Sequence, residues 1–209
     1  EERITVIYQG CHEIFHEKAS AAQIGQVREK YKLPERFVLT VGTLEPRKNA
    51  LLLLKAIART KEKTPVVLVG KATSYQKQLE QVVHEENLQD RVHFIHKVDF
   101  NDLPKIYQAA KIFVYPSRFE GFGIPIVEAI ASGVPVIAAK GSCLEEAGGP
   151  ASLYIDPDAD KELAASIDRL VNDEAACRKM ADASRAHIKP FGPKPFADKL
   201  MEVYKEVMG

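Results

Sequence analysis

The sequence predicts a three-layer α/β/α domain in which a mostly parallel sheet is covered by helices on both faces. Short runs rich in Val, Ile and Leu alternate with longer helical patterns along the 209 residues. These runs are continuously apolar, as expected for parallel strands that are buried on both faces. The chain is also long enough to form one large domain around a sizeable core.

The elements can be assigned in order along the chain, and strands alternate with helices as parallel connections require. Strands are expected at residues 4–8, 37–42, 65–70, 92–95, 112–115, 134–138 and 153–155. Helices are expected at residues 21–31, 49–60, 74–87, 102–109, 125–132, 144–147, 161–171, 174–188 and 195–207. Pro125 suits the first turn of its helix, and Gly133 suits the C-terminal cap. Residues 191–195 hold two prolines and predict a stiff connector into the final, amphipathic helix.

The charge balance and the cysteines restrict the class of protein. The chain has 29 Lys and Arg against 29 Asp and Glu, so no net field attracts nucleic acid or an acidic membrane. Cys11, Cys143 and Cys177 are few and widely spaced, which favours free thiols in a reducing compartment over a disulfide. No signal peptide or membrane-spanning run is visible, so a cytoplasmic location is expected.

A basic corner follows the strand at residues 37–42, where parallel sheets bind their ligands. Gly42 allows a tight exit or the close approach of a ligand. Arg47 and Lys48 are placed at the start of the next helix, where the helix dipole makes basic residues unfavourable. Together with exposed backbone amides, these two cations favour a site for a phosphate or diphosphate. The alternative is a solvated basic pair on a surface turn.

Two carboxylates lie in residues 116–128. Glu120 comes just before a glycine turn, in which Gly121 and Gly123 let the backbone approach a ligand closely. Glu128 is in a helix that is otherwise apolar and holds no basic partner. A buried carboxylate without a partner is costly, and a ligand with hydroxyl groups would satisfy it. The alternatives are that Glu128 pairs with an Arg or Lys from elsewhere in the core, and that Glu120 caps a helix.

Other motifs favour structural roles. Asp156, Asp158 and Asp160 could suggest a metal site, but they precede a helix that Asp158 or Asp160 would cap. The six histidines show no spacing typical of metal ligands. No Gly-x-Gly-x-x-Gly follows the first or second strand, which weighs against a dinucleotide cofactor. We therefore expect neither a metal ion nor a bound cofactor.

Taken in order, these segments resemble the C-terminal half of a GT-B type glycosyltransferase, specifically the retaining group 1 enzymes of family 4. The matching residues are 6–10, 41–49, 68–70, 92–98, 102–103, 109–110, 116–117, 120–125, 128–129, 131–136, 145 and 156–157. They cover nearly the whole chain. The resemblance implies a Rossmann-like domain that forms one half of a GT-B fold. It also implies a nucleotide-sugar-binding domain at residues 1–190, followed by a connector and a crossover helix at 191–209.

The resemblance also implies the roles of individual residues. Glu120 and Glu128 match the Glu-x7-Glu motif, in which Glu128 would hydrogen-bond the nucleotide ribose and Glu120 would hold the donor sugar. Arg47 and Lys48 would grip the diphosphate, so Glu120, Arg47 and Lys48 are the expected catalytic residues. The expected donor-binding residues are Gly42, Thr43, Gly70, Val98, Gly121, Phe122, Gly123, Ile124 and Glu128. The chain departs from many members at Thr43, where they carry an arginine, and it lacks a glycine common near His96.

The implied full-length enzyme transfers a hexose, for which mannose is one candidate, from a nucleoside-diphosphate sugar to a saccharide or lipid-linked acceptor with retention. The acceptor would be bound mainly by an N-terminal domain that precedes this fragment. Peripheral association of the whole enzyme with the inner face of the membrane is a further expectation, and nucleic acid is not an expected partner. The alternatives are a non-catalytic nucleotide-sugar binding module and another GT-B reaction, such as epimerisation or phosphorolysis.

Overall fold

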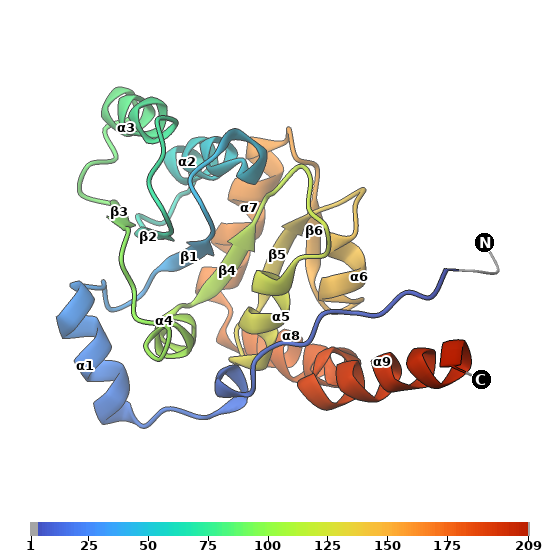
Figure 1. Cartoon of the computed structure of the whole chain (residues 1–209). Coiled ribbons are helices and arrows are strands. Elements are labelled where there is room, and N and C mark those ends of the chain that lie inside the picture. The colour runs from blue at the N-terminus through green and yellow to red at the C-terminus, as the bar shows by residue number, and fades with distance from the viewer. Residues whose placement is uncertain (1–3, 209) are drawn as a thin grey trace.

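A computed structural model describes residues 4–208, and these residues form one parallel sheet of six strands covered by helices on both faces (Figure 1). The strands are β1 (Val38–Val41), β2 (Val66–Val69), β3 (Val92–Ile95), β4 (Ile112–Tyr115), β5 (Val136–Ala139) and β6 (Leu153–Ile155). Their order in the sheet is β3-β2-β1-β4-β5-β6. The chain order therefore reverses between β1 and β4, which is the point at which sheets of this kind bind ligands.

The central strands are parallel, so their carboxyl ends lie together at one edge of the sheet. Val38 of β1 pairs with Val66 of β2 on one side and with Ile112 of β4 on the other, both in parallel. All residues of β2, β4 and β5 are buried. The prediction of a parallel sheet covered on both faces is thus confirmed.

The helices form two layers. On one face lie α1 (Ala21–Tyr31), α4 (Leu103–Ala109), α5 (Ile124–Ala131) and α6 (Leu144–Gly148). On the other face lie α2 (Ala50–Arg59), α3 (Gln76–Glu85) and α7 (Asp160–Asn172). Helix α8 (Glu174–His187) contacts both α7 and α5. Apart from the first predicted strand, every predicted strand and helix is found with ends within two residues of those expected.

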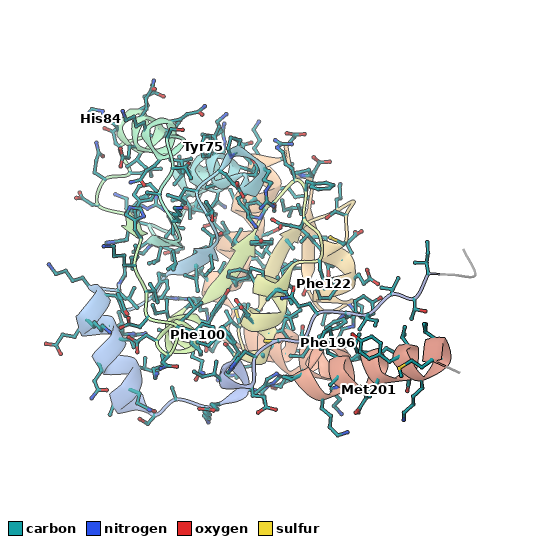
Figure 2. All side chains as sticks on the ribbon, in the orientation of Figure 1. Tyr75, His84, Phe100, Phe122, Phe196 and Met201 are labelled. Carbon is teal, nitrogen blue, oxygen red and sulfur yellow. The ribbon has the colours of Figure 1, made fainter. Side chains whose placement is uncertain are left out.

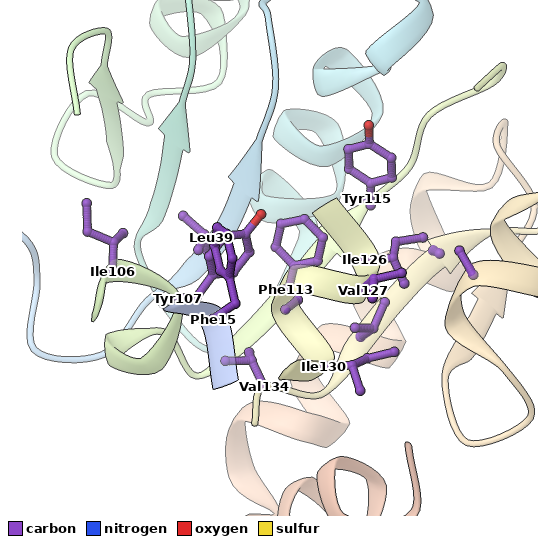
Figure 3. Close-up of a cluster of buried hydrophobic side chains, with 14 of the residues drawn as sticks. Phe15, Leu39, Ile106, Tyr107, Phe113, Tyr115, Ile126, Val127, Ile130 and Val134 are labelled. Atoms are coloured by element: carbon purple, nitrogen blue, oxygen red, sulfur yellow. The ribbon is translucent and has the colours of Figure 1, made fainter. Parts of the chain in front are cut away.

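Alternate residues of each strand supply the two halves of the core, as the period of a strand requires. Leu39 and Phe113 pack beneath α4 and α5, whereas Val38 and Ile112 pack against α2 and α7. Figure 3 shows the first half, in which aromatic rings from β4 and α4 meet the aliphatic side chains of α5. This dense packing fixes α5, whose first residues border the candidate site.

The expected strand at residues 4–8 is wrong. These residues are extended but pair with no strand. Before η1 (Glu13–His16) the segment lies against the C-terminal elements, where the Cys11 amide donates to the Phe191 carbonyl at 2.6 Å. Ile4 and Val6 are largely exposed, because this segment pairs with no strand and the two side chains lie outside the hydrophobic core. An apolar run alone therefore gave a false strand.

The C-terminal part is more helical than expected. In place of a connector over residues 191–195, η3 (Lys189–Phe191) is followed directly by α9 (Pro193–Met208). Prolines are tolerated in the first turn of a helix, which explains why the two prolines do not delay it. Helix α9 extends away from the sheet and buries none of its residues (Figure 1). Residues 1–3 and 209, at the ends of the two predicted domains, lie outside the described residues.

Candidate functional site

A cavity of about 500 Å³ opens at the reversal point, beside the ends of β1 and β4. Its walls come from four parts of the chain: the turn after β1, the end of β4 with the loop into α5, the N-terminal segment, and α6. The lining residues are 6–9, Lys48, Tyr115, 120–125 and Glu146. A second cavity, of about 590 Å³, lies where α5 ends and contains none of the predicted site residues. We therefore take the first cavity as the candidate site.

The turn after β1 is held in place by Asn49. Arg47 and Lys48 were expected at the start of a helix, but they form the 3₁₀ turn η2 (Pro46–Lys48) before α2. Asn49 separates the two elements with a left-handed backbone at φ 56°. Its buried side-chain amide donates to the carbonyl oxygens of Pro116, at 3.1 Å, and Pro157, at 2.8 Å. The basic pair is thus tied to the loops after β4 and β6.

The two cations meet Glu120 in a hydrogen-bonded cluster. The Lys48 Nζ atom lies 2.6 Å from Oε1 of Glu120 and 2.6 Å from the Tyr115 hydroxyl oxygen. Arg47 Nη1 donates to Oε2 of the same carboxylate at 3.0 Å. The hydroxyls of Ser117, at 2.6 Å, and Tyr115, at 3.0 Å, donate to Oε1. Glu120 is therefore an ion-pair partner of the predicted phosphate-binding residues, and the alternative that it caps a helix is wrong.

The electrostatics of this cluster keep Glu120 ionised. Burial alone would raise the pKa of Glu120, but hydrogen bonds from Lys48 and Ser117 outweigh burial and lower it below its ordinary value. The hydrogen bond to Glu120 raises the pKa of Arg47. Burial and the neighbouring Glu120 raise the pKa of Tyr115, so its hydroxyl stays a donor at neutral pH. Glu120 and Lys48 thus line the cavity together, while Arg47 is joined to Glu120 beside it.

The glycine loop after Glu120 packs tightly on α6. Gly123 has φ +116°, and a Cβ atom there would lie 2.9 Å from Cδ2 of Leu144. Only glycine fits this conformation and this contact. The thiol of Cys143, the residue just before α6, donates to the Glu120 carbonyl at 3.2 Å. The predicted residues Gly121, Phe122, Gly123 and Ile124 are thereby placed along the cavity wall.

Glu128 lies one turn into α5 and does not line the cavity. Its Oε2 accepts a hydrogen bond from the buried Tyr107 hydroxyl of α4 at 3.0 Å. Within residues 4–208 it forms no ion pair, so the alternative of a basic core partner is wrong. Burial raises the pKa of Glu128, and the bond from Tyr107 offsets only part of that effect. Its charge is therefore incompletely compensated, as the apolar helix suggested.

The remaining predicted residues lie at the ends of neighbouring strands. Gly42 and Gly70 follow β1 and β2 and touch through their backbones, because a Cβ atom on Gly70 would be 1.8 Å from the Gly42 oxygen. Thr43 follows Gly42, and Nδ1 of His96 lies 3.0 Å from the Gly70 oxygen. Val98 packs against the core. These residues do not line the 500 Å³ cavity but border the same edge of the sheet.

Sequence reasoning missed the neutral hydroxyl groups. Tyr115 and Ser117 both donate to Glu120, and Tyr107 donates to Glu128. A tyrosine at the end of an otherwise apolar strand was the one signal for Tyr115. The pairing of Tyr107 with Glu128 depends on how α4 and α5 cross, which the sequence does not encode locally.

The acidic motif after β6 is engaged in ion pairs. Asp156 pairs with Lys140, Asp158 with Arg118 and Asp160 with Arg59. Neither Asp158 nor Asp160 caps α7 through its side chain. Over residues 4–208, His, Cys, Asp and Glu form no cluster suited to a metal ion. The three cysteines are free thiols, as expected.

Comparison with known proteins gives consistent similarities. The family model described as glycosyl transferases group 1 matches residues 24–187. The chain is 34% identical over 192 residues to O-antigen chain mannosyltransferase B of Escherichia coli, covering 89% of this chain and 50% of that protein. It is 34% identical over 166 residues to O-antigen chain mannosyltransferase RfbU of Salmonella typhimurium, covering 79% and 44%. The chain thus spans about half the length of these two relatives.

A solved structure, Anabaena Alr3699/HepE in complex with UDP and glucose, superposes with a TM-score of 0.88. Its sequence is 27% identical, and the match covers 97% of this chain and 57% of that one. A C-terminal domain of a glycosyl transferase group 1 protein (LpcC) from Francisella tularensis superposes with a TM-score of 0.71 at 27% identity, covering 84% of this chain and 94% of that one. The predicted half of a GT-B fold is therefore confirmed.

Proposed function

The chain belongs to the glycosyl transferases of group 1, and from this premise we propose that it is the donor-binding half of a retaining glycosyltransferase. The whole enzyme would transfer a hexose from a nucleoside-diphosphate sugar to a saccharide or lipid-linked acceptor. Mannose is the favoured hexose, because two relatives at 34% identity are named mannosyltransferases. The related structure that contains UDP and glucose supports a nucleotide sugar as the ligand.

The observation that carries the proposal is the pair of cations joined through Glu120 at the reversal of strand order, where Lys48 lines the cavity and Arg47 lies beside it. As the glycosidic bond of the donor breaks, negative charge builds up on the departing diphosphate. Arg47 and Lys48 would stabilise that charge, each charge-assisted hydrogen bond contributing about 1.5–3 kcal/mol. Fixed cations of this kind lower the barrier because they need no reorganisation during the reaction. We accordingly propose that the leaving group is stabilised by these residues, without a metal ion.

Lys48 can serve a phosphate without releasing its present partners. An ammonium group has three donors, and Glu120 and Tyr115 account for two of them. The third would bind a phosphate oxygen. Glu120, held in place by the two hydroxyls and the two cations, would then direct its carboxylate toward the hydroxyls of the donor sugar. In this arrangement the two cations would bind the diphosphate, and the Glu120 carboxylate would bind the sugar.

Glu128 would take the nucleotide ribose. Tyr107 occupies Oε2, which leaves Oε1 as an acceptor for a hydroxyl group. Hydrogen bonds from a diol would compensate the carboxylate, whose burial is only partly offset by Tyr107. Gly42, Thr43, Gly70 and Val98 would border the nucleotide at the neighbouring strand ends.

The acceptor would be bound by another part of a longer protein. The chain spans about half of its mannosyltransferase relatives. Helix α9 exposes Phe196 and Met201 (Figure 2) and also Tyr204. A groove of about 300 Å³ runs between residues 6–8 and α9. We propose that these exposed side chains pack on the acceptor-binding half. No helix within residues 4–208 has the length and apolar character to span a bilayer. We propose separately that the whole enzyme is cytoplasmic and reaches lipid-linked acceptors at the inner face of the membrane.

A thermal-shift screen of UDP, GDP and ADP, with their sugars, tests whether this chain binds a nucleotide sugar. A bound ligand at 100 times its Kd stabilises a protein by about 2.7 kcal/mol, which such a screen detects. Labelled donor incubated with the longer protein then tests the reaction. Transfer of label to an acceptor supports the proposal, whereas an epimerised or phosphorolysed donor identifies a different reaction. Binding without turnover by the longer protein would indicate a non-catalytic module.

A further inference from the structure

The extended segment at residues 6–9 does more than connect the chain to the domain, because it forms one wall of the 500 Å³ cavity. The glycine loop at residues 121–124 lines the same cavity. The geometry points to Tyr8 as a positioning residue that holds the ring of Phe122, and through it the loop backbone that would face the donor sugar. This inference rests on the proposed function, since the ligand of the loop is the proposed donor.

Three aromatic rings from distant parts of the sequence meet beside the loop. The ring centroids of Tyr8 and Phe122 are 5.3 Å apart, and those of Tyr8 and Phe191 are 5.1 Å apart. The triangle is closed by Phe122 and Phe191, whose centroids are also 5.1 Å apart. All three separations lie in the range of favourable aromatic contacts. Phe122 is therefore held from two sides, by the N-terminal segment and by η3.

Tyr8 is anchored at both ends of its side chain. Its hydroxyl donates to the Glu146 carboxylate of α6, while its ring packs on Phe191. The segment just beyond it is fixed by the backbone bond from Cys11 to Phe191. A Cβ atom on Gly10 would lie 3.1 Å from the backbone of Gly192, so the two stretches are in direct contact. Tyr8 therefore has a defined position although its segment joins no sheet.

The other residues of the loop have few attachments on the side of Tyr8. Gly121 has no neighbouring atom within 4 Å of where its Cβ would be, and the Phe119 side chain is 73% exposed. On the opposite side, Gly123 rests on Leu144 of α6. Phe122 is thus the one side chain of residues 121–123 that fastens the loop toward the N-terminal segment. Loss of the Tyr8 ring would leave Phe122 held by Phe191 alone, beside the contact of Gly123 with Leu144.

The experiment compares Tyr8→Ala, Tyr8→Phe and the control Tyr204→Ala, which removes a tyrosine from the exposed surface of α9. Hydrogen exchange of the amides at residues 121–124 is measured by mass spectrometry or NMR, together with the Tm. We expect about 2- to 12-fold faster exchange in Tyr8→Ala, the range that corresponds to one aromatic pair. Tyr8→Phe keeps the ring, and both it and the control should exchange as the wild type does. If Tyr8→Ala does not fold, Tyr8→Leu takes its place.

Binding completes the test, with UDP-glucose, GDP-mannose, UDP and GDP as the probes. We expect Tyr8→Ala to weaken binding of the nucleotide sugar by a similar factor and to leave binding of the nucleoside diphosphate unchanged. Unchanged exchange at residues 121–124, or a uniform rise across the whole chain, would overturn the positioning role. A wild-type chain that binds none of the four probes would instead reject the proposed function and the donor part of this inference, while the exchange data would still decide whether Tyr8 holds the loop.

Discussion

The Nζ atom of Lys48 lies 2.6 Å from Oε1 of Glu120, and both side chains are largely buried. The sugar-binding carboxylate and the phosphate-binding cation of the proposed mechanism are thus each other's partners before any donor arrives. An ion pair of this kind holds both groups in a fixed orientation, which is the preorganisation that electrostatic catalysis requires. It also means that a diphosphate enters a site whose positive charge is already partly neutralised.

Removal of the cation should weaken the diphosphate site directly. We expect Lys48→Ala to reduce affinity for a nucleoside diphosphate about 10-fold or more, since a hydrogen bond to a charged group contributes roughly 1.5–3 kcal/mol. Isothermal calorimetry measures the change. Lys194→Ala, which removes an exposed lysine on α9 that pairs with Asp198, is the matched control. Equal affinities of Lys48→Ala and the wild type would remove Lys48 from the site.

Neutralising Glu120 should have opposite effects on two ligands. Glu120→Gln leaves Lys48 without its anion and leaves Arg47 with Glu45 alone. We therefore expect tighter binding of inorganic pyrophosphate and weaker binding of a nucleotide sugar relative to its nucleoside diphosphate. The variant should also lose about 1–3 kcal/mol of unfolding free energy at pH 7, because the largely buried Lys48 loses its charged partner. Calorimetry and urea unfolding provide the two measurements. Looser binding of pyrophosphate would contradict the competition between Glu120 and phosphate.

The ribose assignment of Glu128 can be separated from a general effect on the site. Glu128→Ala should lower affinity for a nucleoside diphosphate and leave affinity for pyrophosphate unchanged, because pyrophosphate has no ribose. The expected loss is about 10-fold or more, again the size of a hydrogen bond to a charged group. Calorimetry with both ligands gives the comparison. Equal losses for the two ligands would refute the assignment.

Glu128 should also make stability depend on pH. Because its folded pKa is raised above the ordinary value of 4.5, the folded state binds more protons than the unfolded state as the pH rises above 4.5, and stability falls through that window. Glu128→Gln removes the buried charge and keeps an acceptor for Tyr107. We expect the variant to be more stable than the wild type at pH 8, and equally stable below pH 4.5 by thermal unfolding. A variant that is less stable at pH 8 would show that the charge is compensated.

The contact between Gly42 and Gly70 predicts a sharp difference between two glycines. Gly70→Ala places a Cβ atom 1.8 Å from the Gly42 oxygen, so the strand ends must move apart, at about 1–3 kcal/mol or more of unfolding free energy. Gly25→Ala is the control, because a Cβ there meets nothing within 4 Å and the residue lies inside α1. Alanine should stabilise that helix by roughly 0.5–1 kcal/mol. Chemical unfolding tests both, and a tolerated Gly70→Ala would show that the strand ends are not in contact.

Much of the fold follows from local pattern. Continuous apolar runs such as Val66–Val69 predict buried parallel strands because both faces of each strand meet helices. The same reasoning failed at residues 4–8, where apolar side chains serve contacts outside the sheet. Ile4 and Val6 are exposed and Tyr8 packs on aromatic rings. A short apolar run favours burial in general, but it does not identify the surface that its side chains contact.

The site was predictable where charge and backbone freedom mark it. Arg47, Lys48 and Glu120 do come together, and the glycines beside Glu120 do line the cavity. The hydroxyl groups that hydrogen-bond these carboxylates were not predictable, because the sequence around Tyr107 and Tyr115 is typical of buried core residues. They reach Glu128 and Glu120 only once helices and strands are placed in space.

Helix α9 buries none of its residues, although Met201 and Tyr204 lie on its surface. Its substitutions therefore change little in the free energy of the sheet and its two helical layers. With α9 packed on the acceptor-binding half as proposed, folding and assembly are encoded in separate stretches of the chain. Evolution can then alter what this helix contacts while the proposed nucleotide-binding edge of the sheet remains intact.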